Sequence, residues 1–480
     1  MKKKLFVLMA LMASMSVGAE TFDLWVAGTQ VTSENRKDVL GDGSVKYYDN
    51  GSNELVIKNS TIKGGVNPAI KSRLDFIHIY IEGDVTLEGS VGLDVTGDVQ
   101  IGHTVEYNEN LTINATQTGI LLTAGKLTLP WSLKSFKVKG QEYGLLGVDN
   151  AILSYPFVHN EGDFWPETTF QGINKAAIAG LKTSSGDALD ISYIGMVEPA
   201  NAALIGGNVV DGDNRIVNGD AVVRFAPTEF YGIEVGGVWV TSANASKIRS
   251  DATIGDMTYN STTRVLTLDN AEIFTTCACV KIISAENNNV NIAVKGDCSL
   301  VSTENQGLVC GKDCRIYGLD KSSELTLRSN SSIPTMLLSA SSTIDNLTLN
   351  ALSNGSAPAI KGEENAKLII GSYVDLTATA NVSGTPAISM PLKELGSAVI
   401  TYPTGATWPD GSKEVLDANG NVAGKVVIHS EENGAVDNIL IESSPITDVF
   451  SIDGRKLAAP IRGFNIVRRA DGSCSKIFVK

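Results

Sequence analysis

This chain of 480 residues has few prolines and few histidines, and it lacks the short motifs that mark common enzyme classes. Fourteen prolines are too few for a fibrous or linker-rich chain. The four histidines are scattered, and no His-Glu-x-x-His, Gly-x-Ser-x-Gly or phosphate-loop motif occurs. These absences argue against metalloproteases, serine hydrolases and nucleotide-binding enzymes. We therefore expect a non-catalytic protein rather than an enzyme.

Positive charge is also scarce outside the two ends of the chain. The formal net charge is −14. The leader carries +3 and the segment from Pro445 onward +4, so the rest of the chain carries −21. So acidic a body argues against nucleic acid or an anionic membrane as partner. Its carboxylates are either a solvated surface or candidate ligands for Ca²⁺, although no motif assigns a metal site to particular residues.

Residues 1–19, MKKKLFVLMALMASMSVGA, have the pattern of a secretory signal peptide. Three lysines precede a short apolar run, and small residues stand before Glu20. The apolar run is too short to span a bilayer, and no other stretch is long enough, so we predict an exported chain without a transmembrane segment.

The second half of the chain repeats the first at a nearly constant offset. LWVAGTQVTSEN at 24–35 matches IEVGGVWVTSAN at 233–244, and 77–87 matches 290–300. The offset drifts from 209 to 213, which indicates a duplication with small loop insertions. We predict a first module at 20–230 and a second at 231–440, each opened by a Val-Thr-Ser-x-Asn cap.

Short segments of alternating apolar residues recur within each module, separated by Gly, Asn and Asp. Leu55, Ile77 and Val99 follow at steps of 22, as do Leu325 and Leu347, with Leu368 after a step of 21. Strands at this spacing are typical of a solenoid. The predicted fold is all-β, with two tandem right-handed parallel β-helix modules and a short C-terminal β tail, and with leucine stacked over leucine.

Cysteine is absent before Cys277 and occurs six times from there to the end of the chain. Cys298 lies about one predicted coil from both Cys279 and Cys314, so disulfides between these pairs and buried free thiols are equal alternatives. The spacings match no zinc pattern. The six cysteines are Cys277, Cys279, Cys298, Cys310, Cys314 and Cys474.

The tail, 445–480, resembles the sorting tails of type IX secretion. VFSIDGRKL at 449–457 is similar to their V-Y-x-L-x-G-R-x-L element, and PIRGFNIV at 460–467 to P-x-x-G-x-Y-I-V, with Asn465 in place of Tyr. The resemblance implies export across the outer membrane of a Gram-negative bacterium by its outer-membrane secretion machinery, followed by surface anchoring or release. The alternative is a small terminal β-unit.

Both modules resemble a secreted β-helical carbohydrate-binding family, through L-x-V-x-G-x-x-V-T-S-x-N followed by L-x-L-x-N-x-x-I. The resemblance implies a cell-surface or secreted protein that binds a polysaccharide or glycoconjugate, with Ca²⁺ as the one cofactor to consider. Two other functions stay open: a β-helix polysaccharide lyase or glycoside hydrolase, and an adhesin or structural surface protein that binds another protein.

Two tryptophans and several carboxylates are the candidate site residues. Trp165 and Trp408, each followed by proline in a polar stretch, are the candidate sugar-stacking platforms. Paired carboxylates on adjacent coils would suit glycosidic hydrolysis. However, Gly-Asp recurs nine times, which is better explained by turns, so no catalytic residue is assigned.

Overall fold

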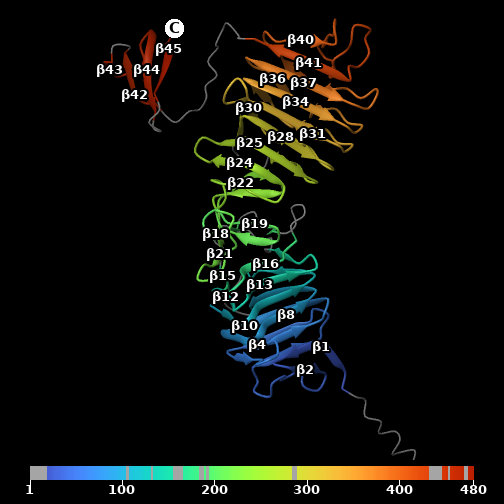
Figure 1. The fold of residues 1–480 in the computed structure, drawn as a ribbon, viewed down its shortest axis with the longest axis vertical. Helices are drawn as coiled ribbons and strands as arrows, with labels where there is room; N and C mark the ends of the chain where they lie inside the picture. Colours follow the sequence, from blue (N-terminus) through green and yellow to red (C-terminus); the bar gives the residue numbers. More distant parts are fainter. Residues whose placement is uncertain are drawn as a thin grey trace, which may run out of the picture. The chain divides into compact units, whose positions relative to one another are not determined.

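The computed structural model describes residues 19–103, 108–130, 133–154, 166–182, 189–190, 194–283, 289–431, 446–451, 454–469 and 474–479. The predicted signal peptide falls almost wholly outside this part of the chain. The described residues form strands and turns without a helix, and they build a parallel β-solenoid of about 12 turns (Figure 1). The predicted all-β, β-helical fold is therefore confirmed. None of these residues forms a helix that could span a membrane.

The chain packs as two compact units. Unit 1 comprises Met1–Tyr231 and Gly236–Ala252, and unit 2 comprises Gly232–Val235 and Thr253–Lys480. The start of the second sequence repeat therefore packs partly with unit 1.

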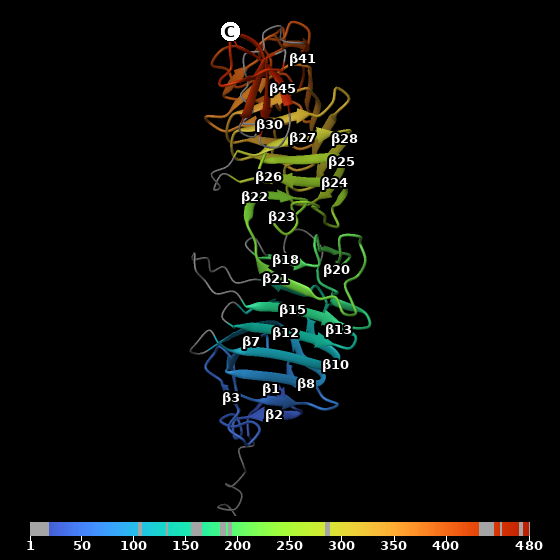
Figure 2. The same cartoon turned by 90° about the vertical axis from the view of Figure 1, so that its left-hand side faces the viewer.

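Two large sheets form the walls of unit 1, and their strands are stacked rung upon rung (Figure 2). The first sheet contains, in spatial order, β18 (Ile194–Glu198), β21 (Val223–Pro227), β15 (Glu167–Gly172), β12 (Ser135–Gly140), β10 (Asn110–Thr123), β8 (Asp84–Thr96), β6 (Ile70–Ser72), β1 (Thr21–Val26) and β2 (Thr29–Thr32), with β5 (Thr61–Lys63), β13 (Tyr143–Val148) and β16 (Ala176–Ala179) attached. The second contains β17 (Leu189–Asp190), β14 (Ile152–Ser154), β11 (Lys126–Thr128), β9 (Asp98–His103), β7 (Phe76–Glu82), β4 (Glu54–Lys58) and β3 (Val45–Tyr48). A hairpin of β19 (Ala203–Ile205) and β20 (Asn208–Val210) and the strand β23 (Val238–Thr241) complete the unit.

Unit 2 repeats this plan. One sheet runs through β22 (Phe230–Val235), β26 (Val280–Ile282), β29 (Leu308–Cys310), β32 (Met336–Leu338), β35 (Ile360–Gly362) and β38 (Ile388–Ser389). The other runs through β39 (Leu392–Glu394), β36 (Lys367–Ile370), β33 (Ser342–Asp345), β30 (Cys314–Gly318), β27 (Asn291–Lys295), β25 (Val265–Thr275), β28 (Asp297–Ser302), β31 (Glu324–Ser329), β34 (Leu347–Ser353), β37 (Val374–Ala380), β41 (Lys425–Ser430) and β40 (Val399–Tyr402), with β24 (Thr253–Asn260) beside β25.

Alternation along the strands decides which side chains enter the core. In β7, Ile77, Ile79 and Ile81 point inward and are buried, while the residues between them point outward. Burying these branched side chains contributes about 1.5–3 kcal/mol each. No single coil encloses its own apolar side, so the stack is what stabilises each rung.

The two repeats agree at the level of individual hydrogen bonds. The Asn35 side chain accepts from Thr32 N–H at 2.7 Å, and the Asn244 side chain accepts from Thr241 N–H at 2.8 Å. Their amide NH₂ groups donate to Gln30 O and Trp239 O, both at 2.9 Å. The asparagine of each predicted cap therefore closes the turn after the opening hairpin.

Each repeat has a glycine at one equivalent position, where a side chain would not fit. Gly83 and Gly296 both have positive φ, and a Cβ on either would lie within 2.3 Å of the side-chain oxygen of an asparagine, Asn59 or Asn270 respectively. These four residues occupy equivalent places in the two repeats.

The predicted leucine register is wrong in part. Leu325 lies over Leu349, not Leu347, because Glu324 aligns with Thr348. Leu368 lies in a different column of strands, where it aligns with Ser342. All three predicted leucines are buried, so the hydrophobic pattern was correct although its stacking partners were not.

Five cysteines of unit 2 are free thiols, namely Cys277, Cys279, Cys298, Cys310 and Cys314. Cys298 stacks on Leu325, and Cys314 on Ser342, so the predicted coil-to-coil cysteine neighbours do not form. The Cys314 thiol instead lies beside the Cys310 thiol.

The tail forms its own antiparallel sheet, in the order β43 (Lys456–Leu457), β42 (Ile446–Ser451), β44 (Gly463–Arg469) and β45 (Cys474–Val479). Asn465, which replaces the expected Tyr, is buried and donates to Ile461 O at 2.6 Å. Its side-chain oxygen accepts from Ile461 N–H at 3.0 Å, so it closes the turn that leads into β44.

Candidate functional site

Of the two tryptophans expected to stack on sugars, the structure describes Trp408 and shows its ring largely buried. Trp165 lies outside the described residues. Trp408 is only 8% exposed, its Nε1–H donates to Ser412 O at 3.2 Å, and the Lys393 ammonium lies 5.4 Å from its ring centroid. The Trp408 ring therefore packs as part of the closing segment and leaves little surface for a ligand.

Most of the described Gly-Asp pairs lie in turns, as predicted, whereas Gly255 lies at a bulge inside β24. Of the seven such glycines that the structure describes, six have positive φ, namely Gly41, Gly83, Gly97, Gly219, Gly255 and Gly296. Asp211 accepts from the backbone N–H groups of Asp213 and Arg215, which fixes a tight loop. Among the described residues, no three His, Cys, Asp or Glu side chains lie close enough together to hold a metal ion.

A stripe of three rings on β7 is the best candidate for a binding site. Phe76, His78 and Tyr80 occupy every second position of the strand, so all three point away from the core. The centroids of Phe76 and His78 lie 6.1 Å apart. Those of His78 and Tyr80 lie 4.1 Å apart, with the rings stacked at 28°. We call these three residues the aromatic stripe.

The neighbouring strands place polar groups on both sides of the stripe. Glu54 on β4 and Gln100 on β9 are the register partners of His78. The partner of Tyr80 on β9 is Gly102, so β9 places no side chain directly opposite the phenol ring. Strands lie about 4.8 Å apart, so a carboxylate, an imidazole and an amide line up within about 10 Å.

Burial and charge keep the aromatic stripe neutral near pH 7. Partial burial lowers the pKa of His78, and the nearby Glu54 carboxylate opposes this only in part. Burial raises the pKa of Tyr80, and Glu54 acts in the same direction. The imidazole and the phenol are therefore uncharged hydrogen-bonding groups at physiological pH.

These polar groups are open to a ligand. Within the described part of the chain, the side chains of Glu54, His78, Tyr80 and Gln100 form no hydrogen bond with one another or with other groups. His78 and Tyr80 cover one face of each other, so a ligand would meet the remaining ring surface. That surface, beside unpaired amide, carboxylate and hydroxyl groups, suits a ligand with both apolar faces and hydroxyls.

Unit 2 lacks the aromatic stripe. The equivalent positions in the second repeat are Asn289, Asn291 and Ala293. The fold therefore does not require rings at these positions.

The sequence carries a signal for this site in the segment FIHIYIE, which alternates aromatic with aliphatic residues. The aliphatic residues are buried, and the rings, His78 included, stand at the outward positions. Its flanking groups, Glu54 and Gln100, come from the coil before and the coil after, so they become visible only when the register is known.

Comparisons with protein-family models, with curated proteins and with solved structures found no match to this chain.

Proposed function

We propose that this protein binds a polysaccharide or glycoconjugate without cleaving it, and that the aromatic stripe of unit 1 is the contact site. The observation that carries the proposal is the line of Phe76, His78 and Tyr80 between Glu54 and Gln100. Apolar faces of sugar rings stack on aromatic rings, while amide and carboxylate groups bind their hydroxyls.

The repetitive scaffold supports this proposal. A solenoid presents an extended surface on each side, and such surfaces suit extended ligands. A linear glycan that lies along β7 would pass all three rings in succession. A partner bound only through the tail would not need the aromatic stripe.

Export and surface location are part of the same proposal. Residues 1–19 would direct the chain out of the cytoplasm, and the β42–β45 sheet would serve as the type IX sorting signal. The turn closed by Asn465 gives the tail an ordered element despite the missing Tyr. Deletion of 446–480 is expected to leave the protein in the periplasm, which cell fractionation would show.

The binding test uses the second repeat as its own control. The triple variant Phe76→Asn, His78→Asn, Tyr80→Ala gives unit 1 the residues that unit 2 carries at these positions. We expect the wild type to bind selected polysaccharides on a glycan array and by calorimetry, and the triple variant to bind at least about tenfold more weakly, since stacked rings dominate such contacts.

A matched control changes the same positions of unit 2. Asn291→Ala should leave glycan binding unchanged. Repeating the titrations with Ca²⁺ and with EDTA tests whether the ion takes part. No binding of the wild type to any glycan, or equal binding by the triple variant, would contradict the proposal.

A further inference from the structure

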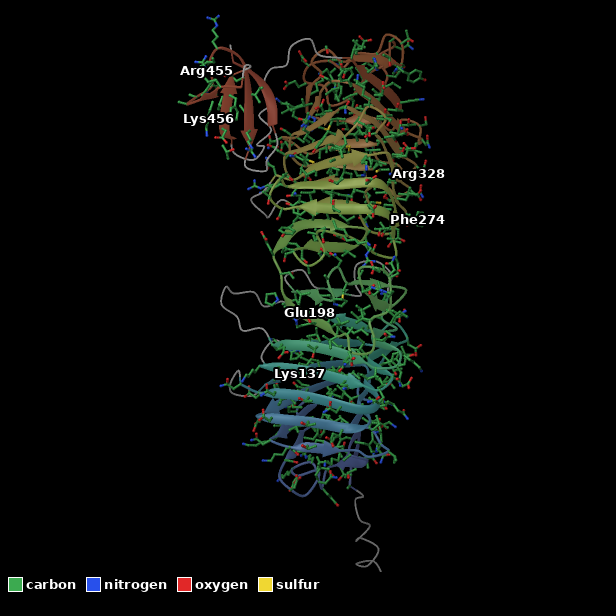
Figure 3. All side chains as sticks on the ribbon, turned by 60° about the vertical axis from the view of Figure 1, so that its left-hand side comes forward. Lys137, Glu198, Phe274, Arg328, Arg455 and Lys456 are labelled. Carbon is green, nitrogen blue, oxygen red and sulfur yellow. The ribbon has the colours of Figure 1, made fainter. Side chains whose placement is uncertain are left out.

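Two of the buried thiols of unit 2 lie at one corner of the solenoid. Cys310 is the last residue of β29 and Cys314 the first residue of β30, and these strands belong to different sheets. Only the turn 311–313 separates them along the chain. Phe274 and Arg328 project from the outer surface of unit 2 (Figure 3). Cys310 and Cys314 are instead 0% and 5% exposed, so both thiols point into the core at this corner.

The two thiols meet there. The Cys314 side chain forms a hydrogen bond with the Cys310 side chain, and both residues are free thiols in the structure. A disulfide requires two cysteines whose side chains point toward each other across a short distance. This pair meets that requirement without a change in the register of either strand.

Two other buried thiols of this unit are turned to backbone groups. The Cys279 thiol donates to Ile273 O at 4.0 Å, and the Cys298 thiol donates to Leu268 O at 3.5 Å. The Cys298 thiol is therefore not turned toward Cys314, the partner that coil spacing alone would allow.

Packing alone does not require cysteine at this corner. In the next coil, the register partners of the two cysteines are Leu338 and Ser342. In unit 1 the equivalent corner, between β8 and β9, has Val95 and Val99, which are both buried. Apolar and small polar residues therefore fit these positions, and the paired thiols give this coil a chemistry that the fold does not demand.

We propose that Cys310 and Cys314 form a disulfide bond when the chain folds in an oxidising medium. Each S–H bond breaks as the S–S bond forms, and the two electrons and two protons pass to a disulfide oxidant. With oxidised glutathione, the products are the protein disulfide and two molecules of reduced glutathione. The proposed export would bring the chain into such a medium, because disulfides form and persist outside the cytoplasm.

The bond should form while the chain folds rather than afterwards. In the folded protein, the hydrogen bond with Cys310 and burial both raise the pKa of Cys314. The thiolate is the form that attacks a disulfide. An oxidant should therefore act on the folded, reduced protein at least about tenfold more slowly than on the folding chain.

The bond would join the two sheets of unit 2 within one coil, since β29 belongs to one sheet and β30 to the other. The turn between them already bonds to its neighbours. Gly311 N–H donates to Ile282 O at 2.8 Å, and the Asp313 side chain accepts from Ser341 N–H at 2.9 Å. A covalent link across this turn should slow amide hydrogen exchange in 308–316, because openings that separate the two strands become rarer.

Peptide mapping without reduction tests the proposal on the full chain. The chain is unfolded and reduced, refolded with oxidised and reduced glutathione, treated with iodoacetamide and digested with trypsin. Trypsin cuts after Lys295, Lys312 and Arg315, so the bond would join peptides 296–312 and 313–315. The two peptides should be recovered joined, with a mass two hydrogens below the sum of the free peptides, and they should separate after reduction.

Cys298 is on the first of these peptides, so variants must assign the sulfur. Cys310→Ser should abolish the joined peptides, and Cys298→Ser should keep them. The double variant Cys310→Val, Cys314→Val gives the corner the residues of unit 1, and its exchange in 308–316 should be the same with and without oxidant. Circular dichroism checks that each variant folds.

Separate peptides from the oxidised wild type would overturn the proposal, and so would joined peptides from Cys310→Ser. Loss of the joined peptides in a folded Cys298→Ser would assign the bond to Cys298 and overturn it equally. The test does not depend on glycan binding or on export, because the oxidant is supplied in vitro.

Discussion

Leu325 lies in register with Leu349 on the next coil, and both side chains are completely buried. Leu349 in turn aligns with Leu376, which is also completely buried. The three leucines form a continuous column through the core of unit 2. In a solenoid, each residue of such a column contributes to the interface between neighbouring coils.

Shortening a leucine side chain in this column should therefore lower the stability of the fold. We expect Leu349→Ala to lower the free energy of unfolding by about 2–5 kcal/mol, because it leaves a cavity that the coils on either side cannot fill. Urea denaturation followed by circular dichroism would measure the loss. Thr348→Ala, which changes an outward side chain on the same strand, should stay within about 0.5 kcal/mol of the wild type.

The register itself is tested by a double-mutant cycle. Leu325→Ala and Leu349→Ala should be non-additive because the two side chains are in contact. Leu325→Ala and Leu368→Ala should add more nearly, since these residues are in different columns. The reverse pattern would contradict the register described above.

His78 should make stability depend on pH. Its folded-state pKa is lowered by burial, so between that value and the unfolded value of about 6.5 the unfolded chain binds more protons. Stability is therefore full above about pH 6.5 and is lost as the pH falls through the folded pKa. Urea titrations of the wild type from pH 5 to 8 should show this slope.

His78→Asn, which introduces the residue that unit 2 has at this position, should reduce that slope. Gln100→Ala changes a neighbour of His78 without removing a titratable group. This variant should therefore keep the pH dependence of the free energy of unfolding. An unchanged slope in His78→Asn would mean that other groups cause the pH dependence.

Arg249 should hold the start of the second repeat to the closing loop of unit 1. Its Nη2 donates to Asn201 O at 2.6 Å and to Asp211 O at 2.9 Å, and its Nη1 donates to the Asn214 side chain. A hydrogen bond that involves a charged group contributes about 1.5–3 kcal/mol to the free energy of unfolding. We expect Arg249→Ala to speed amide hydrogen exchange in 201–214.

Lys247, nearby on the same segment, provides a comparison because it makes a single contact, from Nζ to Gly212 O at 2.7 Å. Lys247→Ala should therefore have the smaller effect. The first repeat has Leu40 at the position of Arg249, so these arginine hydrogen bonds have no equivalent there. Equal amide exchange in the wild type and in Arg249→Ala would show that Arg249 does not stabilise the closing loop.

The buried thiols should resist modification in the folded protein. Burial raises the pKa of Cys279 to about 12, and burial also raises the pKa of Cys298. The thiolate is the reactive form, so both should react slowly with Ellman's reagent at pH 8 and rapidly after denaturation. Cys279→Ser and Cys298→Ser would assign the slow phases, and fast reaction of either thiol in the native state would contradict the burial.

Part of the fold could be predicted from the sequence because its causes are local. Alternation of apolar and polar residues determines which side of a strand is buried, and Ile77, Ile79 and Ile81 follow this rule. The cap asparagines Asn35 and Asn244 bond to groups close by in the chain, so the repeated motif marked the segment, although the structure alone shows the hydrogen bonds.

The stacking partners could not be predicted, because coil length varies. The step along the chain from Leu325 to Leu349 is shorter than the step from Leu349 to Leu376, although both steps advance the column by one coil. Turns of different length can be inserted without disturbing the strands, so the assumption of a constant step selected Leu347 in place of Leu349. The burial of Trp408 depends in the same way on tertiary structure, since Lys393 and Ser412 of the closing segment lie against its ring.

By itself, the sequence determined that the chain forms a duplicated, all-β solenoid, since strand alternation and turn residues act over a few positions. Only the tertiary structure decided which groups from different coils meet, such as Glu54 and Gln100 on either side of His78. These placements depend on register between coils, which is determined by packing of the whole stack rather than by any one segment.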